Sequence, residues 1–66
     1  MNLDNVYTYH EPVKDQIERY KDIRALGKSF AEYMTSQCPD SRERSIALTK
    51  IEEAVMWANA SIARNE

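Results

Sequence analysis

The sequence has very little cysteine, histidine, glycine or proline: one Cys, one His, one Gly and two Pro among 66 residues. Because Cys38 is the only cysteine, no disulfide forms within the chain. Cys38 and His10 supply only two of the four ligands that a structural zinc site needs, so we expect no metal and no other cofactor. The scarcity of glycine and proline, which build tight turns, argues against a turn-rich β fold and favours helices.

Long uncharged apolar runs are also missing, so the sequence predicts no membrane-spanning helix. The first residues lack the basic and apolar regions of a signal peptide, and a single thiol suits a reducing compartment. The net charge of −2 is not the basic excess that is typical of proteins that bind duplex nucleic acid. We therefore expect neither a membrane nor duplex nucleic acid as a partner, whereas a small anion needs only a few local cations.

The length of 66 residues limits the protein to a single domain, 1–66. A chain this short buries only about 60% of its unfolded surface, which leaves its own core marginal. Since disulfides and zinc are excluded, association with further copies of the chain is the expected source of additional stability.

The hydropathy pattern predicts two amphipathic helices after a polar arm that carries aromatic residues. Pro12 suits the first turn of the first helix, because its missing N–H is not needed there. Pro39 disfavours helical geometry at Cys38 and so ends that helix, and either Asp40 or Ser41 is a suitable cap for the next one. Similar helix lengths and a short connection predict an all-α fold, an antiparallel two-helix hairpin that assembles into a homo-oligomeric bundle. The expected segments are an arm at 1–11, a helix at about 12–37, a turn at 38–41 and a helix at about 41–63.

Apolar and small residues recur every three or four positions and define the expected contact seam between the helices. Gly27 lies in the seam of the first helix, where it costs about 1 kcal/mol relative to Ala, so we expect another backbone to approach closely there. The second helix carries apolar residues beyond its seam, including Met56 and Trp57, and this surplus must meet the arm, another copy or a partner. The expected seam residues are Val13, Gln16, Tyr20, Ile23, Gly27, Phe30 and Met34 in the first helix and Leu48, Ile51, Val55, Ala58 and Ile62 in the second.

Residue types that carry catalysis are sparse. One histidine and one cysteine, far apart in the sequence, form no recognisable nucleophile–base pair, and no metalloprotease, P-loop or dinucleotide-binding motif is present. The carboxylates lie at helical surface positions, where solvation and pairing with nearby cations explain them, as for Asp15 with Arg19. The sequence therefore predicts a protein without enzymatic activity.

The arm carries Tyr7 and Tyr9, which would face the same way in an extended segment. Two interpretations of these rings stay open: stacking on nucleobases, worth about 1–3 kcal/mol each, or packing against the start of the first helix. His10, next to them, is either a local hydrogen-bonding residue or a ligand-binding one.

Cations gather at two places along the chain. Arg24 and Lys28 are i,i+4 neighbours on the first helix. Arg42, Arg44 and Lys50 lie at or near the start of the second helix, where free backbone N–H groups also favour anions. Each cation alone is explained by a solvated face with an acidic neighbour, such as Lys50 with Glu53. Paired cations together with an aromatic arm favour an anion-binding site, because arginine donates two parallel hydrogen bonds to a phosphate.

The stretch from Cys38 to Arg64 resembles the C-terminal half of a small phage family, the anti-CBASS cyclic-nucleotide sponges, whose helical hairpin domain is shared with a Thoeris anti-defence sponge. The resemblance covers nearly the whole chain from Tyr9 onward. The string from Arg42 to Arg64 is highly specific, and the motifs of the arm are weaker. The similar stretch is CPDSRERSIALTKIEEAVMWANASIAR, and the upstream motifs are Tyr9, His10 and Pro12, then Arg19 with Tyr20, then Ile23 with Arg24.

The resemblance implies a helical, hexameric protein in the cytoplasm of an infected bacterium. Such a protein binds cyclic oligonucleotide second messengers without cleaving them and keeps them from CBASS effectors. The resemblance also implies that Tyr9 stacks on a base and that Arg24, where the family often has lysine, contacts a phosphate. A second class of pocket, for cyclic trinucleotides, falls on the Arg42–Thr49 segment. The implied partners are a cyclic di- or trinucleotide, such as cGAMP, and other copies of the chain.

The alternative, from a different functional class, is a helical protein-interaction module. Such an adaptor or antirepressor would bind a host protein through the Met56–Trp57 face. The Tyr9/His10 arm distinguishes the two, because an adaptor has no need to pair it with Arg24. The full set of candidate ligand-binding residues is Tyr9, His10, Arg24, Lys28, Arg42 and Thr49.

Overall fold

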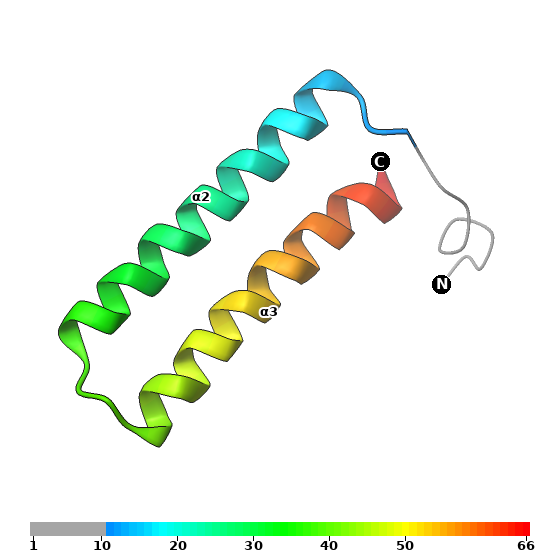
Figure 1. Cartoon of the computed structure of the whole chain (residues 1–66). Helices are drawn as coiled ribbons and strands as arrows, with labels where there is room; N and C mark the ends of the chain where they lie inside the picture. The colour runs from blue at the N-terminus through cyan, green and yellow to red at the C-terminus, as the bar shows by residue number, and fades with distance from the viewer. Residues whose placement is uncertain (1–10) are drawn as a thin grey trace.

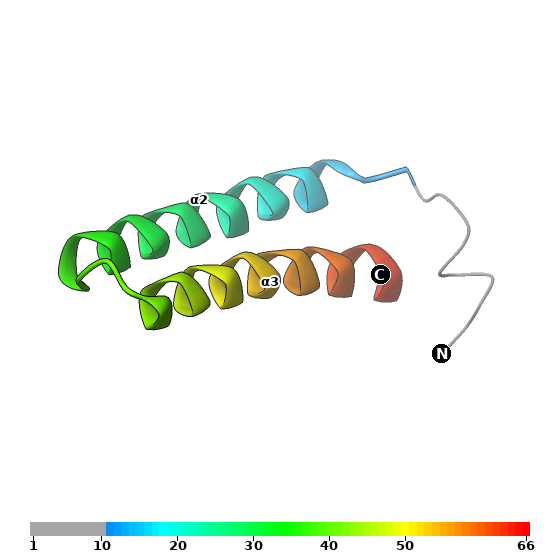
Figure 2. The same cartoon turned by 60° about the horizontal axis from the view of Figure 1, so that its bottom comes forward.

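The computed structural model describes residues 11–66, and within that range the protein consists of two α-helices and no strand. Helix α2 spans Lys14–Gln37 and helix α3 spans Arg42–Asn65, and each contains 24 residues. The helices run antiparallel, side by side, and are joined at one end by a short connection (Figure 1 and Figure 2). The structure confirms the expected all-α hairpin. Since α2 begins at residue 14 rather than at about 12, Pro12 precedes the first turn instead of lying in it.

The break at Cys38 and Pro39 ends α2 as the sequence predicts. Cys38 has an extended backbone (φ −108°, ψ 134°), because proline disfavours helical geometry in the residue before it. The N–H of Cys38 still donates to the carbonyl oxygen of Met34 at 2.9 Å and so closes the last turn of α2. The chain therefore leaves α2 in an extended direction and enters α3 four residues later, at Arg42.

Ser41 and Arg44 hold the start of α3. The Oγ of Ser41 accepts a hydrogen bond from the backbone N–H of Arg44 at 3.1 Å, so Ser41 is the cap of this helix. The other candidate cap, Asp40, forms an ion pair with the Arg44 guanidinium at 3.1 Å instead. The same guanidinium donates to the carbonyl oxygens of Thr35 and Cys38, at 3.4 and 3.2 Å, and so ties the start of α3 to the end of α2.

Side chains also connect the two helices at the opposite end of the hairpin. The N–H of Val13 donates to Oε1 of Gln16 at 3.1 Å, which satisfies a donor that the first turn leaves free. Arg19 donates from Nη1 to Oε2 of Glu66 at 2.8 Å and from Nη2 to Oε1 of the same carboxylate. Asp15 adds an ion pair with Arg19 at 3.2 Å, as the i,i+4 spacing predicts. The guanidinium of Arg19 thus joins α2 to the end of α3.

The side chains along the facing sides of the helices are half-buried. In α3 all the expected seam positions are half-buried. In α2 the observed seam differs from the expected one near its C-terminal end. Ala31 is half-buried, whereas Phe30 stays 53% exposed and Val13 57% exposed. A spacing of three residues from Gly27 to Phe30 and one of four from Gly27 to Ala31 both fit a helical period. The small Ala31 side chain fits between closely spaced helices, where a phenyl ring does not. The half-buried positions are Gln16, Arg19, Tyr20, Ile23, Gly27, Ala31 and Met34 in α2 and Arg44, Ala47, Leu48, Ile51, Val55, Ala58, Asn59, Ala60 and Ile62 in α3.

Gly27 marks a close approach of α3 to α2. A Cβ atom added to Gly27 would lie 2.3 Å from Cγ2 of Val55, far inside van der Waals contact. The close neighbour is therefore a side chain, and not the backbone that the sequence led us to expect. The missing side chain at Gly27 lets Val55 pack directly onto α2, and this packing offsets the helix-propensity cost of glycine.

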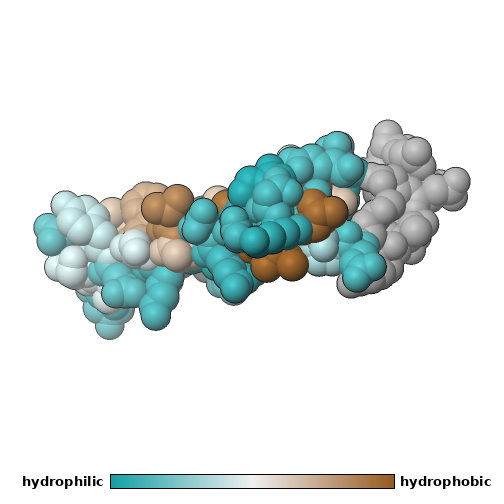
Figure 3. Space-filling model, turned by 90° about the horizontal axis from the view of Figure 1, so that it is seen from above, coloured by the Kyte–Doolittle hydropathy of each residue, from teal (hydrophilic) through white to brown (hydrophobic). Residues whose placement is uncertain are grey.

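No side chain is fully buried within the described part of the chain. Two helices share one contact seam, so apolar side chains elsewhere on them have nothing to pack against, and Figure 3 shows hydrophobic side chains reaching the surface among charged ones. The surplus expected at Met56 and Trp57 is present, since these side chains are 54% and 58% exposed. The large hydrophobic residues exposed in this way are Val13, Ile17, Leu26, Phe30, Tyr33, Ile46, Met56 and Trp57.

We expect Gly27→Ala to destabilise the hairpin, although alanine is the better helix former. The new methyl group would overlap Cγ2 of Val55, a β-branched side chain with little rotamer freedom. Overpacking of this kind costs about 1–3 kcal/mol, which thermal unfolding followed by circular dichroism measures. The double variant Gly27→Ala/Val55→Ala gives the methyl group room, so its cost should be smaller than the sum of the two single costs. Additive costs would contradict the close contact.

The contact between Arg19 and Glu66 should depend on pH. The hydrogen bond from Arg19 lowers the pKa of Glu66 below its ordinary value of 4.5. A carboxyl group whose pKa is lowered by folding stabilises the folded state above its ordinary pKa, and this contribution is lost as the pH falls through the lowered value. We expect Glu66→Gln to melt slightly below the wild type at neutral pH and together with it at about pH 2. A difference in melting temperature that is the same at both pH values would show that the contact does not depend on the charge.

Candidate functional site

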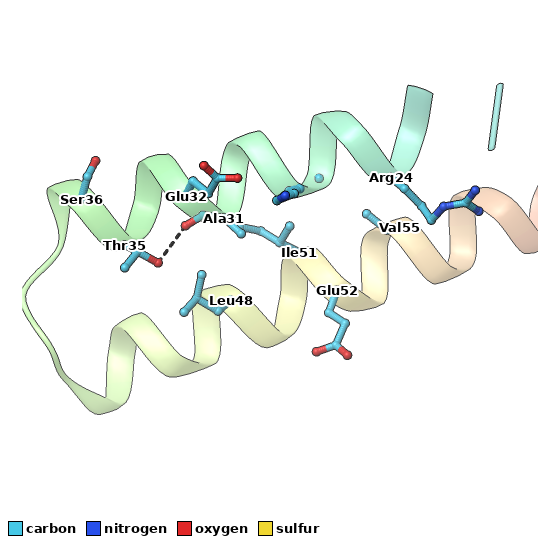
Figure 4. A pocket seen from close by; sticks show the side chains of 11 residues that line it. Arg24, Ala31, Glu32, Thr35, Ser36, Leu48, Ile51, Glu52 and Val55 are labelled. Atoms are coloured by element: carbon cyan, nitrogen blue, oxygen red, sulfur yellow. Dashed lines mark hydrogen bonds between the residues drawn. The ribbon is translucent and has the colours of Figure 1, made fainter. Parts of the chain in front are cut away.

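A groove of about 770 Å³ runs along one flank of the seam between α2 and α3. Its volume falls within the range of about 300–1,000 Å³ that is typical of small-molecule sites. Figure 4 shows α2 forming one side of the groove and α3 the other. The groove is lined by Arg24, Gly27, Lys28, Ala31, Glu32, Thr35 and Ser36 from α2 and by Leu48, Ile51, Glu52 and Val55 from α3.

Polarity in this groove changes sharply from its floor to its rims. The lining residues that are half-buried are all glycine or apolar, and the lining residues that are exposed are all polar or charged. Gly27 and Ala31, which have little or no side chain, form the α2 part of this floor. An apolar floor of this kind suits a flat ring, and the charged rims suit ionic groups attached to it.

Arg24 and Lys28 supply the positive charge of the groove. They lie one helical turn apart on α2, and in Figure 4 the side chain of Arg24 reaches across toward α3. Neither forms an ion pair with any residue of the described range, in contrast to Arg19 and Arg44. Two cations without carboxylate partners beside an apolar floor are well placed to bind an anion.

The groove also contains two carboxylates, Glu32 on the α2 side and Glu52 on the α3 side. In Figure 4 they lie along opposite rims. The sequence predicts both as ordinary surface carboxylates, and the structure brings them to the same groove. For Glu52 the sequence contains one indication of this position. Glu52 directly follows the seam residue Ile51, and a residue next to a seam position lies at the edge of the seam.

The hydroxyl groups in the groove are occupied by helix carbonyls. The Oγ1 of Thr35 donates to the carbonyl oxygen of Ala31 at 2.9 Å, and the Oγ of Ser36 donates to that of Tyr33 at 2.7 Å. A nucleophilic hydroxyl needs a neighbouring general base rather than a backbone carbonyl. Neither hydroxyl of the groove is therefore paired with a general base in this arrangement.

A second, smaller depression of about 300 Å³ lies on α3 near the hairpin turn. It brings together two of the candidate residues, Arg42 and Thr49. Lys50, in the same depression, forms the expected ion pair with Glu53 at 3.7 Å, which leaves Arg42 as its unpaired cation among the described residues. The depression is lined by Arg42, Ser45, Ile46, Thr49 and Lys50.

A third depression, of about 260 Å³, lies along the seam where the side chains are apolar. It shares Gly27, Ile51 and Val55 with the groove, but no charged residue lines it. Leu26, on its edge, is 71% exposed. This apolar flank suits contact with another apolar protein surface. It is lined by Ile23, Leu26, Gly27, Phe30, Ile51, Ala54, Val55 and Ala58.

The candidate ligand-binding residues fall into two groups on a single hairpin. Arg24 and Lys28 line the groove. Arg42 and Thr49 line the smaller depression, so the two groups do not form one common site within the hairpin. The candidates that lie outside the described residues are Tyr9 and His10.

Two kinds of feature are absent from residues 11–66. No group of three or more His, Cys, Asp or Glu side chains in this range is placed to hold a metal ion. Neither α2 nor α3 is long and apolar enough to cross a membrane.

The chain was also compared with known proteins. A family model, described as the Acb2/Tad1 hairpin domain, matches residues 1–63. The chain belongs to the Acb2/Tad1 family. This is the family of anti-CBASS and anti-Thoeris sponges, which the resemblance of the sequence had indicated. Neither a curated protein nor a solved structure gives a significant match to the chain.

Membership of the Acb2/Tad1 family gives the protein a general functional class, that of an anti-defence cyclic-nucleotide sponge. A sponge acts by holding a ligand, so its site requires affinity and no reacting groups. The groove of this Acb2/Tad1 hairpin, with its unpaired cations and its apolar floor, meets that requirement.

Proposed function

We propose that the protein sequesters cyclic oligonucleotide second messengers in the cytoplasm of an infected bacterium, without cleaving them, and so prevents the activation of CBASS effectors. The ligands are cyclic dinucleotides such as cGAMP and, at a second site, cyclic trinucleotides. The observation that supports this most directly is the groove in which the unpaired cations Arg24 and Lys28 border an apolar floor. Membership of a sponge family supports the functional class.

The groove suits one half of a cyclic dinucleotide. The guanidinium of Arg24 can donate two parallel hydrogen bonds to a phosphate, and Lys28 adds a second positive charge one turn away. A base placed on the apolar floor gains about 25 cal/mol for each Å² of apolar surface removed from water. A base and its neighbouring phosphate are thus held by adjacent parts of one groove.

In this proposal a second copy of the chain binds the other half of the ligand. A cyclic dinucleotide is nearly twofold symmetric, and a twofold dimer presents each binding residue twice. Tyr9, which the resemblance assigns to base stacking, and His10 beside it would complete the site. Nanomolar affinity corresponds to about −12 kcal/mol, and a preformed assembly reduces the entropy lost on binding.

Assembly into a homohexamer is supported by the exposed apolar surface. No side chain in the described range is fully buried, and Leu26 on the apolar flank is 71% exposed. Ile46 and Trp57 are eleven residues apart on one side of α3, where the ion pair of Lys50 with Glu53 lies between them, and both side chains are exposed. The apolar flank and these two exposed side chains provide contacts for more than one neighbour.

The smaller depression is our proposed site for cyclic trinucleotides. Arg42 supplies its unpaired positive charge, and Thr49 supplies a hydroxyl group beside it. The depression is open and shallow in one hairpin, so several copies must contribute to enclose a ligand.

Arg24→Ala should weaken the binding of cGAMP about tenfold or more, because charge-assisted hydrogen bonds to phosphate would be lost. The melting temperature of the unliganded protein should hardly change, because Arg24 has no ion-pair partner among the described residues. Isothermal titration calorimetry measures the affinity. Arg42→Ala, which removes the same charge from the other depression, is the matched control and should leave the dissociation constant for cGAMP within about twofold.

Equal affinities of wild type and folded Arg24→Ala would refute the assignment of the groove. The fate of the ligand tests the absence of cleavage. After the complex is denatured by heat, mass spectrometry should recover cGAMP intact, and recovery of a linear product would show an enzyme instead.

The assembly has its own test. Light scattering coupled to size-exclusion chromatography should give a mass of about six times 7.7 kDa for the wild type. Leu26→Glu places a charge on the apolar flank and should yield smaller species, whereas Ala25→Glu, at an exposed position on the side of α2 opposite Gly27, should not. A monomeric wild type would contradict the proposed assembly.

A second candidate function rests on the exposure of Met56 and Trp57, which are 54% and 58% exposed. An adaptor or antirepressor would use such a face to bind a host protein. Thermal melting with a panel of cyclic nucleotides separates the two functions, because a ligand that binds only the folded state raises the melting temperature. A panel without any shift would favour the adaptor.

A further inference from the structure

Glu52 places a second negative charge, in addition to that of Glu32, in the groove to which we assign an anionic ligand. Its side chain lines the groove from α3 and is exposed, and it forms no ion pair or hydrogen bond within the described range. Its neighbours one turn away on the same helix are all uncharged, so no cation of α3 compensates it. These neighbours are Leu48, Thr49, Val55 and Met56.

The adjacent residue, Glu53, provides a comparison, because its carboxylate is exposed on the same helix but has an ion-pair partner. Glu53 lies outside the groove and forms an ion pair with Lys50 at 3.7 Å. Its charge is thereby accounted for within α3. Glu52 has no such partner, and repulsion between its carboxylate and the phosphates of a ligand disfavours binding unless the ligand forms a compensating contact.

The chemistry of that compensating contact is restricted. An ionised carboxylate has two hydrogen-bond acceptors and no donor. Guanine presents two adjacent donors on its Watson–Crick edge, N1–H and the N2 amino group. Adenine presents one donor, the N6 amino group, next to the N1 lone pair, which repels the second carboxylate oxygen. Of the two purines, guanine alone can therefore satisfy both oxygens of a carboxylate at once.

We infer that Glu52 is a specificity-determining residue that makes the groove prefer guanine-containing cyclic dinucleotides over their adenine counterparts. This rests on the proposed function. In this inference the base lies on the floor formed by residues such as Ile51 and Val55. Its donor edge points toward the α3 rim, from which the side chain of Glu52 extends outward, away from α2 (Figure 4). The phosphate lies toward Arg24 and Lys28 on the α2 side. The carboxylate thus disfavours adenine by repulsion, without excluding a mixed ligand such as cGAMP, and binds guanine through two hydrogen bonds.

The test is to measure the affinity of wild type and Glu52→Gln for cyclic di-GMP and cyclic di-AMP by calorimetry. Glutamine has nearly the same shape but only one acceptor, so the dissociation constant for cyclic di-GMP should rise about tenfold. The constant for cyclic di-AMP should fall about threefold, because a negative charge has left the groove. Glu53→Gln carries the same charge change outside the groove and should leave the ratio of the two constants unaltered.

The opposite signs are decisive, because loss of a negative charge alone would strengthen the binding of both dianions equally. Equal shifts for the two ligands, or no shift for either, would overturn the role of Glu52 while leaving the proposed function intact. A wild type that binds neither ligand, nor any other cyclic nucleotide, would overturn both. Glu52→Asp keeps the charge but is one methylene shorter, so it should weaken cyclic di-GMP binding without strengthening that of cyclic di-AMP. Circular dichroism confirms that each variant is folded.

Discussion

The constraint on which this structure depends is that two helices share only one contact seam. The seam is narrow because Gly27 admits the side chain of Val55 and Ala31 takes the place that a phenyl ring would fill. Packing along it half-buries the facing side chains, but no third element covers the flanks of the seam within the described range. The surfaces to which we assign ligand binding and assembly are therefore the same surfaces that the fold leaves open.

The open surfaces differ in chemistry. The groove has cations and carboxylates around an apolar floor, whereas the apolar flank has no charged lining residue at all. Water solvates the charged rims of the groove at little cost, but a large exposed apolar surface is unfavourable in a free monomer. This division suits a protein that uses one part of its surface for an ionic ligand and another for contact with further copies. The family model describes a hairpin domain, and a hairpin is short enough to leave both of these surfaces uncovered.

Much of the fold and part of the site were predictable from local features of the sequence. Pro39 ends α2 for a steric reason that involves only its neighbour, and Arg24 and Lys28 share a groove because residues four apart lie on one side of a helix. The choice between Ser41 and Asp40 as the cap was less predictable. It depends on Arg44, whose guanidinium pairs with Asp40 while its own backbone N–H donates to Ser41.

The sequence by itself determined the two helices, their antiparallel pairing and the pairs of cations, because helical periodicity, proline and residue spacing act within a few residues along the chain. Only the tertiary structure decided that Ala31 rather than Phe30 enters the seam and that Glu52 borders the same groove as Arg24. Both outcomes depend on how α3 is rotated and shifted against α2. That alignment is set by contacts between distant residues, such as Gly27 with Val55, which no local pattern specifies.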